Sequence, residues 1–244
     1  MNTQTDARMK TFNVFKRNKV FIPVIHLLRI EHALTNVEIV YKYCDCAMLV
    51  NNYCSSDVLI EAVDAIKAKY PNKWLGINIL EDIGTLFFLF GKTDICKKIN
   101  GLWMDNSFIT DFDLEYQQIP RQILTTLKNA CFEGVYFGSV FFKYVPMGGD
   151  TDKILKNATQ LVDIVTTSGD GTGIPIPVNK IRKIHSSVGK TNYVAVCSGI
   201  TATNIRSISD FCDIFVVGTA INDSNHNIVV SKLLELNTII DSLN

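Results

Sequence analysis

Three segments in the second half of this sequence combine glycine with serine and threonine. The first is the run TTSGDGTG after a β-branched stretch, which contains Thr167, Ser168, Gly169, Asp170, Gly171, Thr172 and Gly173. Ser198 with Gly199, and Gly218 with Thr219, repeat this composition further along the chain. Glycine leaves backbone N–H groups accessible and hydroxyl groups add donors, so such loops suit an anion. One glycine-rich turn is usually only a turn, but three in succession predict a seat for a phosphate group.

Other polar residues that could do chemistry follow other short apolar runs. The candidate catalytic residues are His26, Asp82, Asp105 and Lys143, and Asn52 and Asn78 are further candidates for ligand binding. Imidazole and carboxylate groups can transfer protons, and an ammonium group can hold a phosphate or, if desolvated, form a Schiff base. Structural alternatives are a buried His26 bonded to backbone, aspartates that cap helices or turns, and an ordinary ion pair for Lys143.

The loop tyrosines and the remaining histidines are weaker candidates for the functional site. Tyr53 and Tyr144 fall at predicted loops, where each could stack on a base or a sugar ring, although loop tyrosines are also common without ligands. His32, His185 and His226 are expected at the surface.

Eight short β-rich runs would position these residues. They span residues 21–26, 46–50, 74–79, 101–104, 134–141, 162–167, 193–198 and 213–218. Helical periodicity and helix boundary signals lie between them, for example at 56–70, 151–161, 177–189 and 201–211, and 105–133 leaves room for an irregular segment. This alternation predicts an α/β fold, a single (β/α)8 TIM barrel with a parallel eight-stranded core. An open doubly wound sheet is the alternative, because one missed strand changes the count.

A barrel would bring the candidate residues together, because the loops that follow its strands all gather at one end. Composition agrees with one domain: the chain has 244 residues, of which 47% are hydrophobic. We expect a basic leader or helix at residues 1–20 and the barrel at 21–244. The leader contains Arg8, Lys10, Lys16, Arg17 and Lys19, which indicates a solvated segment or, alternatively, a contact for an anionic partner.

Charge, hydropathy and cysteine usage argue against several classes of protein, namely nucleic-acid-binding, membrane, secreted and zinc proteins. Lys plus Arg and Asp plus Glu number 24 each, so no overall field favours nucleic acid or an anionic membrane. The sequence has no apolar run long enough to span a bilayer and no secretory signal pattern. Its seven cysteines lack the paired spacing of a zinc site, so we expect reduced thiols, no metal and a cytoplasmic protein. Cofactor and oligomeric state remain open, and a homo-oligomer is allowed.

Five segments resemble the BtpA family of phosphate-binding TIM barrels. They are VTTSGDGTGIP, CSGITATNI, FVVGTAI, PVIHLL and LGINILED, and the likeness spans residues 23 to 222. The family takes its name from a factor needed for photosystem I accumulation, and its bacterial relatives are thought to act on nucleotides or sugars. The resemblance implies the fold more firmly than a reaction. It also favours Asp82 over its neighbour Glu81 as the residue that faces the site.

The chain departs from the family pattern at residues that would carry chemistry. Asn51 and Asn52 stand where the family has Glu-Asn, and Ser139 and Lys143-Tyr144 stand where it has an Asp and a Lys-His pair. Near the fourth strand, Met104 or a neighbour replaces an arginine. From the glycine-rich loops and the rim carboxylates we expect a protein that binds a sugar phosphate or nucleotide and hydrolyses or transfers at a glycosidic or phosphoester bond by carboxylate acid/base chemistry. The alternative is a noncatalytic assembly or regulatory factor.

Overall fold

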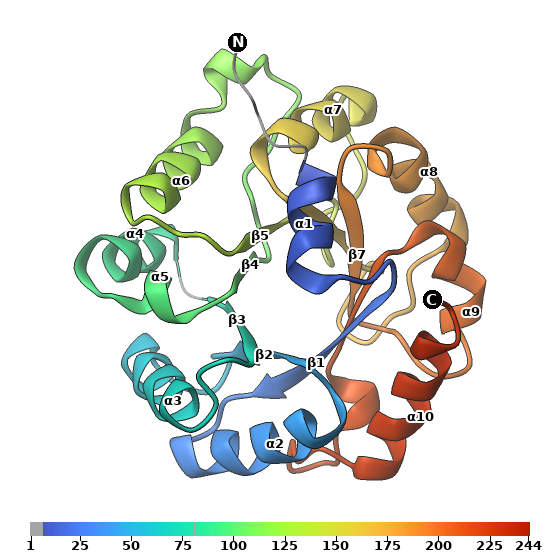
Figure 1. Cartoon of the computed structure of the whole chain (residues 1–244). Coiled ribbons are helices and arrows are strands. Elements are labelled where there is room, and N and C mark those ends of the chain that lie inside the picture. The colour runs from blue at the N-terminus through green and yellow to red at the C-terminus, as the bar shows by residue number, and fades with distance from the viewer. Residues whose placement is uncertain (1–6, 81) are drawn as a thin grey trace.

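The chain folds into a closed barrel of eight parallel strands in the order β1 to β8, which confirms the predicted (β/α)8 architecture. The computed structural model describes residues 7–80 and 82–244. The strands are β1 (Val20–His26), β2 (Cys46–Val50), β3 (Trp74–Asn78), β4 (Gly101–Met104), β5 (Val135–Ser139), β6 (Ile164–Thr167), β7 (Tyr193–Cys197) and β8 (Ile214–Val217). Figure 1 looks along the barrel and shows the helices as an outer ring.

The connecting segments supply that outer ring. The helices and helical turns are α1 (Ala7–Phe15), α2 (Ile30–Tyr43), α3 (Ser56–Lys69), α4 (Ile83–Lys92), α5 (Ile95–Lys98), η1 (Leu114–Tyr116), α6 (Gln118–Asn129), α7 (Thr151–Leu161), α8 (Val178–Val188), α9 (Ile205–Ile208), η2 (Ser209–Phe211), η3 (Thr219–Ile221) and α10 (Val230–Asp241). The predicted irregular segment precedes α6. The predicted helix at 201–211 is instead two short pieces, α9 and η2.

Strand residues alternate between two hydrophobic cores, as the period of two in a β-strand requires. Residues that point into the barrel form one cluster, which includes Ile22, Met48, Phe137 and Ile214. Their neighbours point outward and pack against the helices in a larger cluster, which includes Ile25, Leu49 and Val165. Both faces of the strands are therefore buried, and this explains why the strands read as continuous apolar runs.

Helix α1 lies across the amino-terminal end of the barrel (Figure 1). Arg8 pairs with Asp213 at 3.3 Å and Lys10 pairs with Asp163 at 2.8 Å. The ring of Phe15 lies 5.3 Å from that of Trp74, which fills the bottom of the barrel interior. The described part of the basic leader is thus packed on the barrel, and its charges meet aspartates that precede β6 and β8.

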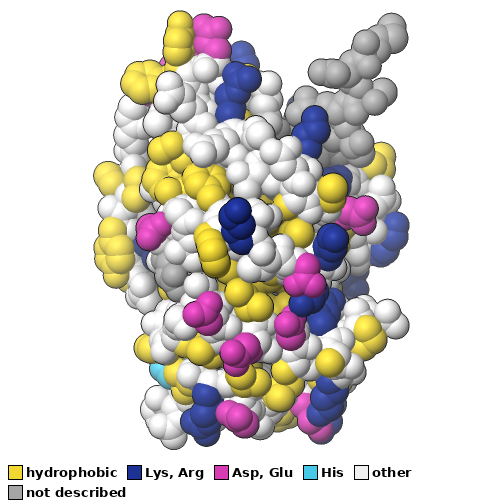
Figure 2. All heavy atoms as spheres, turned by 90° about the vertical axis from the view of Figure 1, so that its left-hand side faces the viewer, with side chains coloured by type: hydrophobic (Ala, Val, Ile, Leu, Met, Phe, Trp, Pro, Cys, Tyr) yellow, Lys and Arg dark blue, Asp and Glu magenta, His cyan; other side chains and the backbone are white. Residues whose placement is uncertain are grey.

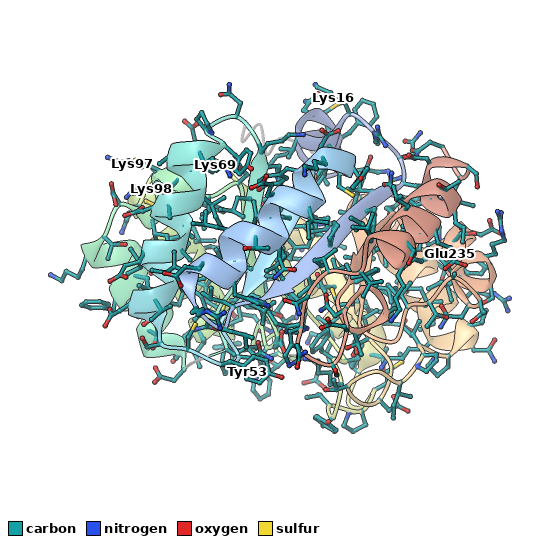
Figure 3. The ribbon with its side chains drawn as sticks, turned by 90° about the horizontal axis from the view of Figure 1, so that it is seen from below. Lys16, Tyr53, Lys69, Lys97, Lys98 and Glu235 are labelled. Carbon is teal, nitrogen blue, oxygen red and sulfur yellow. The ribbon has the colours of Figure 1, made fainter. Side chains whose placement is uncertain are left out.

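The two ends of the barrel can be compared in Figure 3, where Lys16, just after α1, and Tyr53, just after β2, lie on opposite sides. On the helical side formed by α3 to α6, Figure 2 shows side chains of both charges spread among hydrophobic ones. None of the helices in the described residues is both long and apolar enough to cross a membrane.

Candidate functional site

A cavity of about 350 Å³ opens at the carboxyl ends of the strands. Ten of the predicted site residues line it: His26, Asn52, Asn78, Lys143, Thr172, Gly173, Ser198, Gly199, Gly218 and Thr219. The remaining wall is largely apolar and comprises Val24, Val50, Leu80, Trp103, Ile200, Thr201, Val216, Val217 and Ala220. An apolar cavity with a few convergent polar groups is the usual form of a small-molecule site.

The loops after β6 and β7 are bonded together along one side of this cavity. The Gly173 N–H donates to the Ser198 hydroxyl at 2.8 Å. Gly199 has a φ of +69°, and a Cβ at this position would lie 2.2 Å from the carbonyl oxygen of Ile174. Only glycine fits this close crossing of two backbones, so the predicted small residues are needed to form the wall.

The adjoining wall comes from the loops after β7 and β8. The Asn204 side chain accepts from the Thr201 N–H at 2.9 Å and donates to the Gly199 carbonyl at 2.7 Å, which fixes the first of these loops. In the second loop, the helical turn η3 begins immediately after Gly218. The first N–H groups of a helical turn have no acceptor within it, and Thr219 and Ala220 line the cavity.

His26 ends β1 at the edge of the cavity, and its Nδ1 lies 3.2 Å from Asn52 Oδ1. An amide oxygen only accepts, so this contact places the ring proton on Nδ1 and leaves a lone pair on Nε2. Burial lowers the pKa of His26, and His226 and Lys143 lower it further, whereas the Asn52 hydrogen bond raises it. The ring is therefore neutral near pH 7, and its Nε2 lies beside Gly218, where a Cβ would approach it to 3.1 Å.

Lys143 enters the cavity from the loop after β5. Its Nζ pairs with Asp105 Oδ2 at 2.9 Å, and the other oxygen of Asp105 accepts from Asn78 Nδ2 at 3.1 Å. Lys143 has a φ of +48°, which is uncommon for a residue with a side chain. Its N–H donates to the Ser168 hydroxyl at 2.6 Å, so a residue of the glycine-rich loop holds Lys143 in this conformation.

The other predicted site residues lie outside the cavity wall. Asp82 caps α4, because its carboxylate accepts from the N–H groups of Gly84 and Thr85. Asp105 lines a separate cavity of about 300 Å³ between the loops after β4 and β5. Within the glycine-rich loop, Thr167 and Ser168 are buried and Asp170 is exposed 3.6 Å from Lys180. Gly169 and Gly171 pack against Ile174, and Glu81 lies outside the described residues.

None of the three histidines predicted at the surface is fully exposed, and His185 is half-buried on α8. The prediction for His32 is wrong, because this residue is buried on α2, where its Nε2 lies 3.1 Å from Asn36 Nδ2. His226 is half-buried at the mouth, with its ring centroid 5.1 Å from that of His26. Sequence spacing gives no signal for His226, because 200 residues separate the two histidines. Trp103 is a further wall residue that no polar pattern indicates.

Comparisons with known proteins give the fold and no closer relationship. No protein-family model matches the chain, and no curated protein matches it. Solved structures do match over nearly the whole chain. (S)-3-O-geranylgeranylglyceryl phosphate synthase from Thermoplasma acidophilum, in complex with substrate sn-glycerol-1-phosphate, is 19% identical with a TM-score of 0.63, and the match covers 96% of this chain and 98% of that one.

Two further solved structures have the same architecture. KGPDC from Streptococcus mutans is 12% identical with a TM-score of 0.65, covering 93% of this chain and 99% of that one. Orotidine 5'-monophosphate decarboxylase from Methanocaldococcus jannaschii is 16% identical with a TM-score of 0.61, covering 92% and 98%. At these identities the likeness shows the shared barrel fold. The synthase and the orotidine 5'-monophosphate decarboxylase are both named for phosphorylated compounds.

Proposed function

We propose that this protein binds a small phosphorylated molecule, a sugar phosphate or a nucleotide, at the carboxyl end of the barrel and catalyses hydrolysis or transfer on it. The observation that supports this most directly is the shared cavity, which is lined by Gly173, by residues 198–201 and 218–220, and by Lys143. Gly173 and Thr201 use their N–H groups within the loops, so the N–H groups at the start of η3 and the ammonium group are the donors that complement a phosphate. The barrel neighbours named for phosphorylated compounds support the same ligand class.

The proposed chemistry is acid/base catalysis at a glycosidic or phosphoester bond. His26 Nε2 takes a proton from the attacking water or hydroxyl group, because its ring is neutral and Asn52 orients it. Lys143, held by Asp105, stabilises the negative charge that develops on the leaving oxygen. Asp82 has no part in this scheme, because its carboxylate is engaged in capping α4. We also propose that the chain is a divergent member of the BtpA family. It has the family's glycine-containing loops in its second half but has Asn51 and Ser139 where the family has acidic residues.

Binding of simple phosphates tests the ligand class. We expect inorganic phosphate and D-ribose 5-phosphate to bind the wild-type protein, and Lys143→Met to weaken both at least about tenfold, because the cavity loses its cation. The matched control is Lys153→Met, since Lys153 also forms an ion pair, with Asp113 at 2.7 Å, but lies outside the cavity. Calorimetric titration measures the affinities. Equal affinity in both lysine variants, or no binding of either phosphate by the wild type, contradicts the proposal.

The proposed role of His26 needs a separate measurement. In an assay of phosphate or base release from nucleoside and sugar phosphates, His26→Gln should lower kcat at least about a hundredfold while the titrated affinity for D-ribose 5-phosphate stays within about threefold. A glutamine keeps hydrogen bonding near Asn52 but cannot take the proton. Full turnover in this variant would remove His26 from the mechanism.

A further inference from the structure

Three aromatic rings, one from the end of a strand and two from loops, meet beside the cavity. The ring centroids of Tyr53 and His226 are 4.8 Å apart, those of His26 and His226 are 5.1 Å apart, and those of His26 and Tyr53 are 6.2 Å apart. We call these three residues the aromatic cluster. His26 ends β1, whereas Tyr53 and His226 follow β2 and β8, and both of these strands pair with β1 in the closed barrel.

The loop that carries His226 is closed by hydrogen bonds to Asp223. Asp223 accepts from the N–H groups of Asn225 and Asn227 at 2.8 and 2.9 Å, which closes a tight loop with His226 inside it. His226 itself has a φ of +61°. A non-glycine residue in this conformation is uncommon, and such residues concentrate at functional sites. The ring of His226 is therefore presented at the mouth by a preformed loop.

Tyr53 is the exposed member of the cluster. The residue is 53% exposed, although its ring packs against two others, and Figure 3 shows it at the carboxyl end of the barrel. Next to it in sequence, Asn52 lines the cavity and contacts His26. Leu80, which also lines the cavity, is 42% exposed. A ligand that leaves the cavity on this side meets the exposed ring of Tyr53 and the exposed side chain of Leu80.

We propose that the aromatic cluster stacks against the planar ring of a nucleobase, so that the ligand of this protein is a nucleotide. A nucleobase offers a flat π-face to such rings, whereas a sugar ring can pack against them only through its C–H groups, so a nucleobase gains more from this contact. The inference rests on the proposed function for the phosphate end of the ligand. It adds the base, and it places Tyr53 and His226 among the residues that determine specificity.

The test compares a nucleotide with the same molecule without its base. Uridine 5'-monophosphate and adenosine 5'-monophosphate are titrated against D-ribose 5-phosphate. The wild type should bind at least one of the two nucleotides at least about tenfold more tightly than the sugar phosphate, since stacking on one aromatic side chain contributes roughly this factor or more. Tyr53→Ala should remove most of this ratio of nucleotide affinity to D-ribose 5-phosphate affinity, and it should leave the affinity for D-ribose 5-phosphate itself unchanged. Tyr53→Phe should keep the ratio.

Tyr43→Ala is the matched control. Tyr43 is 42% exposed, similar to Tyr53, but it ends α2, before β2 begins, and so lies towards the opposite end of the barrel. This variant should keep the wild-type ratio. His226→Ala provides a second test of the cluster and should also reduce the ratio.

Each outcome separates the two proposals. If D-ribose 5-phosphate binds but neither nucleotide binds more tightly, the base-stacking inference is overturned and the phosphate site stands. If a nucleotide binds more tightly and Tyr53→Ala and His226→Ala both keep the ratio, another surface holds the base and the inference is again overturned. If neither nucleotide nor sugar phosphate binds, the proposed function fails and this inference fails with it.

Discussion

Charged residues at the two ends of the barrel are arranged differently. At the amino-terminal end, Asp163 accepts from Lys10 at 2.8 Å and from the backbone N–H of Tyr136 at 2.8 Å. Asp213 likewise contacts Arg8, and it accepts from the N–H of Val194 at 2.9 Å. Each aspartate thus joins one strand to its neighbour and also to α1. Their hydrogen-bonding capacity is used within the protein, which is the arrangement expected of residues that stabilise a fold.

At the carboxyl end, charged and polar residues border open space. Lys143 is paired with Asp105, but its side chain is 23% exposed and lines the cavity. His26 uses one ring nitrogen for Asn52 and directs the other towards Gly218. The same residue types therefore stabilise one end and remain accessible to a ligand at the other. This agrees with the general rule that barrel enzymes carry their active sites at the carboxyl ends of the strands.

The largest expected effect is at the amino-terminal end. Asp213→Ala should lower the free energy of unfolding by about 3 kcal/mol, because Arg8 and the Val194 N–H both lose a buried acceptor. Urea denaturation followed by circular dichroism measures this change. Affinity for D-ribose 5-phosphate should stay at the wild-type value in the folded variant. A large loss of affinity with little loss of stability would mean that the division between the two ends is wrong.

At the carboxyl end we expect the opposite pattern. Gly218→Ala places a Cβ 3.1 Å from His26 Nε2 and 3.4 Å from the Val24 Cβ, at the proposed phosphate seat. Phosphate affinity should fall about tenfold, the usual penalty for losing one or two kcal/mol of binding energy, while stability changes by less than about 1 kcal/mol.

Gly148→Ala is the control for Gly218→Ala, because a Cβ at Gly148 meets no atom within 4 Å in the described residues. It should change neither affinity nor stability measurably. If both glycine variants bind phosphate as the wild type does, the wall formed by residues 218–220 is not where the phosphate lies.

The barrel could be predicted from the sequence because its signals are local. Runs such as CAMLV and YVAVCS are apolar at consecutive positions, and the observed strands begin and end within two residues of the predicted ones. In a barrel, residues at or just after the carboxyl ends of the strands surround the opening at that end. This rule predicted that His26, Asn52 and Asn78 lie there, and all three line the cavity.

The rest depended on loops and on distant contacts. Asn78 is the last residue of β3 and faces the cavity, whereas Asp82 lies four residues further along, where its carboxylate caps α4. His226 reaches the mouth through a loop in which its φ is +61°, which no periodicity encodes. The basic leader is packed on the barrel because Asp163 and Asp213 precede two strands at that end, and those partners lie 153 and 205 residues away in the sequence.

The smallest expected effect is a pH dependence that originates at His26. Burial lowers the pKa of His26 in the folded protein below the ordinary value of 6.5, so the unfolded chain takes up this proton at a higher pH than the folded one. Stability should therefore be lost as the pH falls from 7 through 6.5 towards the folded pKa, and the loss should stop below it. His26→Gln removes this contribution, so its urea midpoint should change less between pH 7 and pH 5.

Asn52→Ala should act in the opposite direction. The hydrogen bond from Asn52 raises the pKa of His26, so its loss lowers the folded pKa and widens the pH range over which stability is lost. Parallel midpoint curves for all three proteins would show that His26 is as easily protonated in the fold as in the unfolded chain, and the mouth would then lack the neutral base that distinguishes it from the opposite end.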